Sequence, residues 1–328
     1  KHFTKLISEL KVERPSWVDK SVGIINKAWK DHVDLFCDVG LEQAILLQAA
    51  NMKFAKAIKP KRHQHSIEFE EYVNHMAHVI AFYLRRARQG TEKTYDQFAK
   101  NFFNHEETTN RIITFNYDDV LDQALLKTFK HKNLYFSHLK PSKSKPIQKG
   151  GTKSPLLLKL HGSVNWNCAT DDFKKIVKSN SIENEPHKID DIWYRSKGCP
   201  LPEDEDSPCI IPPVESKPIT SIKIFKYIWT RASEYLHECK ELYVCGYSLP
   251  PTDNLASSLF KEFSNTRIET ITVIDPDPAI MVKWKNLLSR KNVKKLDGFI
   301  IQIFLSLLMI LSHKQMKFCI ADSFSGAL

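Results

Sequence analysis

Paired cysteines are missing from this chain. Its seven cysteines are an odd number spread over 328 residues, and none of them stands in a close pair. The four from Cys168 to Cys239 include no Cys-x-x-Cys arrangement. Disulfide frameworks and structural zinc sites both depend on paired cysteines, so the sequence argues against either. We expect a protein of a reducing compartment, the cytoplasm, with no bound metal.

Long apolar runs are also missing, and no charged-then-apolar signal follows Lys1. Residues 299–311 form an apolar stretch of 13 residues, interrupted only by Gln302 and Ser306. A helix that crosses a membrane needs about 20 such residues. We therefore predict no membrane span. Residues 298–328 are interpreted as a C-terminal apolar helix, packed on the core, and a tail, with a partner or membrane contact as the alternative.

An excess of negative charge is absent too, because the net charge is +10. The basic residues are scattered over several segments with few aromatics, at 56–62, 127–132, 140–145 and 290–295. This scatter favours a solvated surface over a nucleic-acid groove, and we expect no specific nucleic-acid partner. Dinucleotides such as NAD are anions as well, so the charge does not discriminate between ligands. An apolar fraction of 42% is ordinary for a globular protein.

Two kinds of hydrophobic pattern divide the chain. Four segments of the first hundred residues place apolar side chains at helical spacing, at 18–29, 41–54, 67–88 and 95–103. After residue 110 the pattern changes to strands that alternate with helices. That alternation predicts a parallel sheet with right-handed crossovers. The predicted fold is α/β, with a helical insertion over residues 18–105.

Four short apolar runs in the second part end in polar residues or glycine. Asn116 and His161 follow the first two runs, Gly246 and Ser248 follow the third, and Asp275 follows the fourth. Ligands of an open parallel sheet bind beyond the carboxyl ends of its strands. We therefore predict one site, assembled from these strand ends at one edge of one sheet.

Five segments around these strand ends resemble the motifs of one family. They are Thr114-Phe115-Asn116-Tyr117-Asp118, Lys159-Leu160-His161-Gly162-Ser163, Ile210-Ile211-Pro212-Pro213 with Lys217, Gly246-Tyr247-Ser248-Leu249 with Asp253, and Val273-Ile274-Asp275. In this order and spacing the chain resembles the sirtuin-like domain, in the branch of bacterial anti-phage defence NADases. The resemblance implies a Rossmann-type NAD-binding domain over residues 1–297.

The resemblance also implies the roles of individual residues. His161 would be the general base, because imidazole changes its charge near neutral pH. Asn116 would orient a water or a ribose hydroxyl, with a backbone turn as the alternative role. The residues expected to contact NAD are Asp118, Gly162, Gly246, Ser248 and Asp275. Asp118 has helix capping as its alternative, and Asp275 has a turn before Pro276.

The activity implied is that of a hydrolase for the N-glycosidic bond of NAD+, which releases nicotinamide and ADP-ribose in antiviral defence. A homo-oligomer or a partner protein of the defence system is expected. Pro15-Ser16-Trp17 resembles the segment that follows the family's glycine-rich loop, yet residues 1–22 contain no glycine. Such a loop holds a pyrophosphate at a helix start. A non-enzymatic module that senses NAD or ADP-ribose therefore remains open, as does an NAD-dependent protein deacylase.

Overall fold

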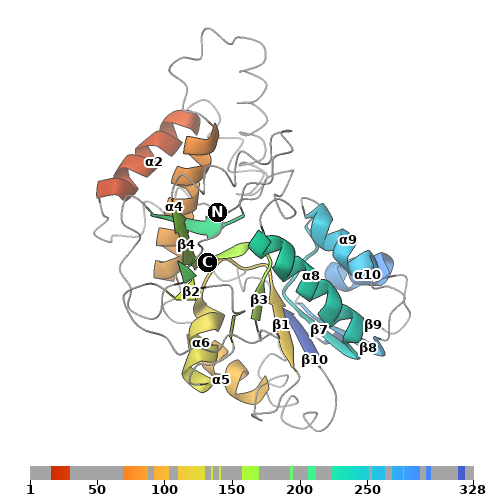
Figure 1. Cartoon of the computed structure of the whole chain (residues 1–328). Helices are drawn as coiled ribbons and strands as arrows, with labels where there is room; N and C mark the ends of the chain where they lie inside the picture. Colours follow the sequence, from red (N-terminus) through yellow and green to blue (C-terminus); the bar gives the residue numbers. More distant parts are fainter. Residues whose placement is uncertain are drawn as a thin grey trace. The chain divides into compact units, whose positions relative to one another are not determined.

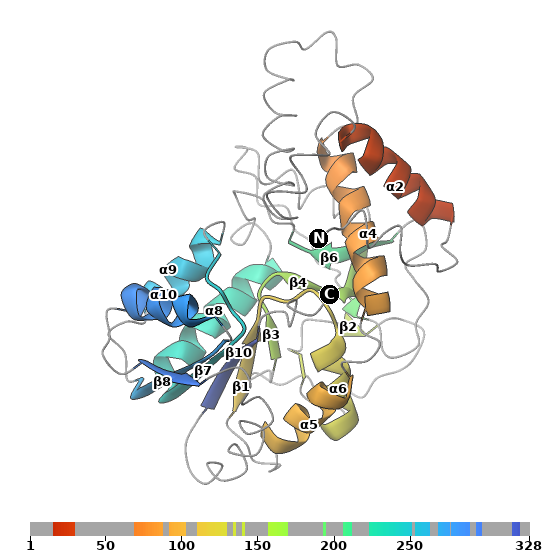
Figure 2. The ribbon, with the colours of Figure 1, turned by 180° about the vertical axis from the view of Figure 1, so that it is seen from behind.

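The computed structural model describes part of the chain, and that part falls into two compact units. The described residues are 16–29, 69–87, 92–102, 110–129, 134–135, 140–141, 157–169, 193–194, 206–211, 223–250, 253–262, 268–275, 277–288, 293–296 and 317–321. The first unit comprises Lys1–Ala87 and Ser163–Lys223, and the second comprises Arg88–Gly162 and Ile224–Leu328. Figures 1 and 2 draw the ribbon from opposite sides.

The second unit contains a six-stranded sheet in the order β3-β1-β10-β7-β8-β9. Its strands are β1 (Arg111–Thr114), β3 (Leu157–Lys159), β7 (Glu241–Cys245), β8 (Thr270–Ile274), β9 (Val293–Leu296) and β10 (Lys317–Ala321). Each strand runs parallel to its neighbours. The chain is therefore an α/β protein with a Rossmann-like parallel sheet, as the alternation in the sequence predicts.

The register of this sheet aligns the carboxyl ends of five strands. Thr114 pairs with Lys159 on one side and with Ala321 on the other. Cys245 in turn pairs with Ala321 and with Ile274. These five residues form one row across the sheet, whose strands are labelled in Figure 1. The residues that follow them consequently leave the sheet along the same edge.

Burial explains why the strand sequences are continuous apolar runs. Ile112, Ile113, Leu157, Leu158 and Val244 are all fully buried. In a strand the side chains alternate between the two faces, so burial of neighbours means that both faces are covered. This is the usual situation of a parallel sheet, which needs apolar side chains on each face.

Among the described residues of the second unit, five segments are helices. They are α5 (Glu92–Phe102), α6 (Val120–Phe129), α8 (Lys223–Glu238), α9 (Asn254–Glu262) and α10 (Pro278–Leu288). Helix α8 buries Phe225, Ile228, Ala232 and Leu236, which recur at the spacing of one helical face. Helix α5 packs against α6, where Lys127 and Asp96 form an ion pair, and α10 packs against α9, β8 and β9.

In the first unit, helix α2 (Ser16–Trp29) packs against α4 (Phe69–Ala87). The Ser21 Oγ lies 2.8 Å from the His75 Nδ1, and α4 buries Met76, Val79 and Ile80. Strand β4 (Gly162–Ala169) pairs antiparallel with β5 (Trp193–Tyr194) and also neighbours β6 (Asp206–Ile210), which α4 contacts. The two-residue strand β2 (Lys140–Pro141) belongs to the second unit.

Helices α2, α4 and α5 confirm three of the four helical segments predicted before residue 110. The predicted helices at 41–54 and 299–311 lie outside the described residues. Strands β4, β9 and β10 were not predicted. In particular, the tail expected within residues 298–328 contains β10, which lies in the middle of the sheet. Five residues after a polar stretch are too short for periodicity to distinguish a strand from a tail.

Two absences can be stated for the described part of the chain. None of its helices is both long and apolar enough to cross a membrane. Its four cysteines Cys168, Cys209, Cys239 and Cys245 form no disulfide with one another. Burial raises the pKa of the Cys239 thiol well above its usual range, and the nearby Glu241 carboxylate adds to that effect. Cys239 is therefore a protonated, apolar core residue rather than a nucleophile.

Candidate active site

The strand order of the sheet reverses between β1 and β7. From β1 the chain continues to β3 on one side, whereas β7, β8 and β9 follow one another on the other side, with β10 in between. Open α/β sheets bind their ligands outside the carboxyl ends of the strands at such a reversal. Asn116 follows β1 and Gly246 follows β7, so both lie at this position.

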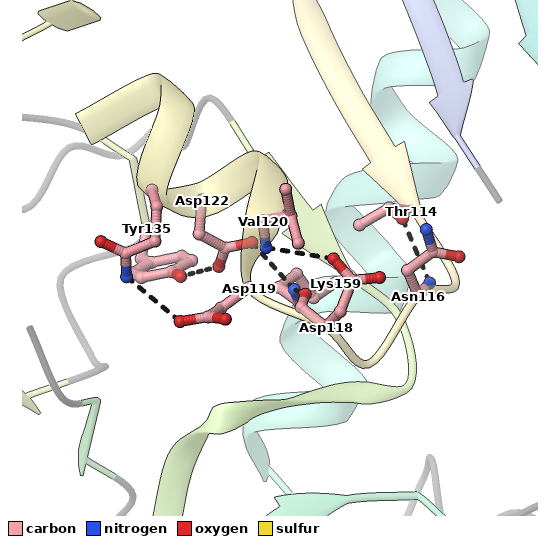
Figure 3. A network of polar contacts seen from close by, with 9 residues as sticks. Thr114, Asn116, Asp118, Asp119, Val120, Asp122, Tyr135 and Lys159 are labelled. Carbon is pink, nitrogen blue, oxygen red and sulfur yellow. Dashed lines mark hydrogen bonds and ion pairs between the residues drawn. The ribbon is translucent and has the colours of Figure 1, made fainter. Parts of the chain in front are cut away.

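The loop between β1 and α6 carries Asn116 and two aspartates. The Asn116 backbone N–H donates to the Thr114 Oγ1 at 3.1 Å, which turns the chain back at the end of the strand. The Asp118 Oδ1 accepts from the Val120 N–H at 3.0 Å, and the Asp119 carbonyl accepts the first helical bond from Gln123 at 3.0 Å. The two aspartates thus start helix α6 (Figure 3). The carboxylate of Asp118 makes the capping contact that was its alternative role, and its contact with NAD stays a prediction.

The side-chain oxygen of Asn116 is an acceptor that no described residue satisfies. Its Oδ1 is buried and has no hydrogen-bond partner in the described part of the chain. A buried polar atom left in this state costs about 1–3 kcal/mol, so native proteins rarely keep one without a reason. A ligand hydroxyl or a bound water that donates to this oxygen would recover that free energy.

His161 lies in the two-residue turn between β3 and β4. The Leu160 N–H before it donates to the Thr114 carbonyl at 2.9 Å, and the Trp229 Nε1–H donates to the Leu160 carbonyl at 3.0 Å. Gly162 after it has a φ of 80°, a conformation that only glycine adopts without strain. The two hydrogen bonds of Leu160 fix the backbone next to His161, and this restricts the position of the imidazole.

Aromatic rings surround the imidazole of His161, whose side chain is 7% exposed. The Phe115 ring contacts it edge-on at 5.2 Å between centroids, and the rings of Tyr117 and Trp229 lie at 6.0 and 6.4 Å. Phe115 and Tyr117 are the two neighbours of Asn116 in the sequence. The structure therefore brings the Asn116 loop and His161 together.

Asp253 is the charged partner of His161, a relation that the sequence analysis missed. The His161 Nε2 lies 3.4 Å from the Asp253 Oδ2, and Asp253 is 4% exposed. The same oxygen accepts from the Tyr247 hydroxyl at 3.1 Å, and the Asp253 Oδ1 faces the Ala256 N–H at 3.4 Å. Asp253 also caps α9, because its carbonyl accepts from the Ser257 N–H at 3.1 Å. In the sequence, the only sign that Asp253 could belong to the site was its position in one of the five motif segments.

The loop after β7 lies beside the end of β8. The Gly246 N–H donates to the Ile274 carbonyl at 3.0 Å, which places Gly246 next to Asp275. Gly246 has a φ of 67°, and Leu249 has a φ of 51°, which is unusual for a residue with a side chain. Helix α10 holds the loop through the Trp284 Nε1–H on the Tyr247 carbonyl, at 3.1 Å.

Ser248 and Asp275 make contacts that do not by themselves require a ligand. The Ser248 carbonyl lies 3.4 Å from the Lys283 Nζ, and the Asp275 Oδ1 accepts from the Asp277 N–H at 2.9 Å. Asp275 thus forms the turn that was the alternative to ribose binding. Both residues stand at the expected edge of the sheet, and their contact with NAD stays a prediction.

A buried ion pair lies next to the Asn116 loop. Lys159 is 1% exposed and its Nζ is 2.9 Å from the Asp122 Oδ2. Burial raises the pKa of Asp122 to about 6, although the Lys159 ammonium acts in the opposite direction. Asp119 and Asp118 add a small further increase of this pKa, because their negative charges lie close by. The sequence analysis assigned no role to Lys159 or Asp122.

A metal site does not emerge from the described part of the chain. It contains no group of three or more His, Cys, Asp and Glu side chains that could hold a metal ion. What this part does offer is a paired imidazole, a buried amide oxygen and two glycine-containing strand ends. Those groups suit proton transfer and the binding of hydroxyl groups.

Comparison with known proteins identifies the segment that carries this site. Residues 110–294 match the family model of the SIR2-like domain, which covers more than half of the 328 residues. The match begins just before β1 and ends within β9, so it contains Asn116, His161, Gly246, Asp253 and Asp275. No curated protein matches the chain.

Proposed function

The chain belongs to the SIR2-like domain family, and we propose from this that it is an NAD+ glycohydrolase. The reaction would cleave NAD+ to nicotinamide and ADP-ribose. One observation supports the proposal above the others. His161, paired with Asp253, lies beside the loop of Asn116 at the strand ends where an α/β sheet binds its ligand.

The proposed chemistry needs a base and a fixed water. As the bond from the ribose C1′ to the nicotinamide nitrogen breaks, its electron pair leaves with nicotinamide and positive charge builds on the ribose. A water oxygen forms the new bond to C1′, and its proton passes to the His161 imidazole. Asp253 then stabilises the imidazolium, because its Oδ2 lies 3.4 Å from the His161 Nε2.

Asn116 would position the water or the ribose. Its buried Oδ1 accepts a hydrogen bond from the attacking water or from a ribose hydroxyl, which holds the reacting oxygen near C1′. The aromatic rings of Phe115, Tyr117 and Trp229 limit the access of bulk water to the imidazole. Asp118, Gly162, Gly246, Ser248 and Asp275 are proposed to contact the rest of the dinucleotide.

The biological role proposed is antiviral defence, in a cytoplasmic protein that acts as a homo-oligomer or with a partner protein of the defence system. The motif segments from Thr114 to Asp275 support this branch of the family. A second candidate is a module that senses NAD or ADP-ribose without cleaving it, which would need the same binding residues but no general base.

The release of nicotinamide tests the proposal. The purified protein is incubated with NAD+, nicotinamide is quantified by chromatography, and NAD+ affinity is measured by calorimetry. We expect His161→Ala and Asn116→Ala each to reduce turnover at least about 10²-fold, with a much smaller change in affinity. His237→Ala on α8 and Asn286→Ala on α10 are matched controls, because both side chains are exposed. Wild-type protein that binds NAD+ and releases no nicotinamide would instead support the sensor.

A further inference from the structure

Lys159 is a charged residue with almost no access to water. It ends strand β3, two residues before His161, and is 1% exposed. Lysine is almost never buried to this extent unless its charge is paired. The partner is the Asp122 carboxylate of α6, which is 0% exposed and lies 2.9 Å from the ammonium. The two residues therefore form a fully buried ion pair.

The ion pair is connected to two other parts of the second unit. The Lys159 ammonium also donates to the backbone carbonyl of Asp118, in the loop between β1 and α6. The Tyr135 hydroxyl donates to the Asp122 Oδ1, so both carboxylate oxygens are occupied. Figure 3 draws these contacts together with the Asn116 side chain. The register that pairs Lys159 with Thr114 explains why the ammonium reaches this loop.

These contacts hold the Asn116 loop on both sides. On one side the Asn116 N–H donates to the Thr114 Oγ1 at 3.1 Å. On the other side, two residues later, the Asp118 carbonyl accepts from the Lys159 ammonium. Only Tyr117 lies between Asn116 and that second anchor. The backbone on each side of Asn116 is thus tied to a strand of the sheet.

We propose that the buried Lys159–Asp122 pair is a positioning device that sets the location of Asn116 in the site. This inference rests on the proposed function, in which the Asn116 Oδ1 orients the reacting water or ribose. A buried ion pair is seldom more stabilising than apolar side chains of the same size, because both charges lose their hydration. The role of the pair is therefore geometric: it connects the end of β3, which precedes the turn with His161, to the loop that carries Asn116.

Paired substitutions separate this role from simple stabilisation. Removing one partner alone would leave a buried charge, so the test uses the double variant Lys159→Met with Asp122→Asn. The asparagine Oδ1 can still accept from the Tyr135 hydroxyl, and no net charge is left behind. The control is Lys127→Met with Asp96→Asn, an ion pair that also involves α6 but has a lysine side chain 67% exposed. Thermal unfolding and circular dichroism confirm that each protein is folded.

The first readout is hydrogen exchange of the backbone amides from 115 to 120. We expect the Lys159/Asp122 variant to exchange about tenfold faster or more in this segment, because the anchor at Asp118 is lost. The second readout is turnover of NAD+, which should fall roughly 10- to 100-fold with little change in affinity, since misplacement of a positioning group lowers the rate of the bound complex. The Lys127/Asp96 control should change neither readout.

The two readouts distinguish failure of this inference from failure of the proposed function. Unchanged exchange in the loop overturns the positioning role, whatever happens to turnover. Wild-type protein without nicotinamide release refutes the glycohydrolase, and loop exchange then decides the positioning role alone. If the double variant does not fold, Lys159→Met with Asp122→Leu removes the polar pair completely and is measured in the same way.

Discussion

Asp253→Asn is expected to slow the cleavage of NAD+ while leaving the fold intact. The substitution removes the charge that faces the His161 Nε2 and keeps the shape of the side chain. Asparagine is as good a helix cap as aspartate, so α9 keeps its start. Its Oδ1 can also retain the contact with the Ala256 N–H, which is 3.4 Å away. The melting temperature should therefore change little.

The size of the effect follows from the distance between the two groups. Unit charges 3.4 Å apart attract one another by about 5 kcal/mol at an effective dielectric constant of about 20. That value is an upper limit on the stabilisation of the imidazolium, because the amide dipole of asparagine replaces part of it. A loss of about 2–3 kcal/mol of transition-state stabilisation corresponds to a roughly 30- to 150-fold lower kcat.

The assay measures kcat and KM for nicotinamide release, together with thermal unfolding. Asp277→Asn is the matched control, because Asp277 is an exposed cap whose Oδ1 accepts from the Ala279 N–H at 2.8 Å at the start of α10. It should leave kcat unchanged. Wild-type turnover in Asp253→Asn would refute the role of this carboxylate. A loss of turnover matched by a large fall in melting temperature would assign Asp253 to the fold instead.

Other expected outcomes concern backbone conformation, pH and metal. Gly246→Ala should lower the free energy of unfolding by about 1–2 kcal/mol, because its φ of 67° strains any residue with a Cβ. By contrast, Gly23→Ala should raise it by about 0.5–1 kcal/mol, since Gly23 lies in α2 with open space around it; denaturant titration measures both. The pKa of Asp122 is raised to about 6 from an ordinary 3.8, so the folded protein binds the extra proton. This group's contribution to stability is thus fully present below about pH 4 and is lost as the pH rises through 6, by up to about 3 kcal/mol. Comparing the pH dependence of unfolding of the wild-type protein with that of the double variant Lys159→Met with Asp122→Asn checks the sign. Finally, elemental analysis of the purified protein should find no stoichiometric zinc, and a chelator should not unfold it. One zinc ion per chain would instead support the hypothesis that the protein is a deacylase.

The sequence determined the local structure and the candidate edge of the sheet. Apolar runs around Ile112, Leu157, Val244 and Val273 predicted strands, and all four residues are buried in the parallel sheet. This succeeds because continuous burial on both faces requires an unbroken apolar run, which is visible in the sequence itself. The common location of the polar residues that follow these strands could also be predicted from the sequence, because the carboxyl ends of parallel strands lie at one edge of the sheet.

Only the tertiary structure decided which distant polar groups meet. No local pattern pairs His161 with Asp253, or Lys159 with Asp122, because those contacts depend on strand register and on how α6 and α9 pack. The central position of β10 in the sheet could not be predicted from the sequence either, because it depends on pairing with β1 and β7 and not on the five residues of β10 alone. Periodicity reports which side of an element is buried. The partner of a buried charge is settled by the requirement that every such group be satisfied once the chain has closed around it.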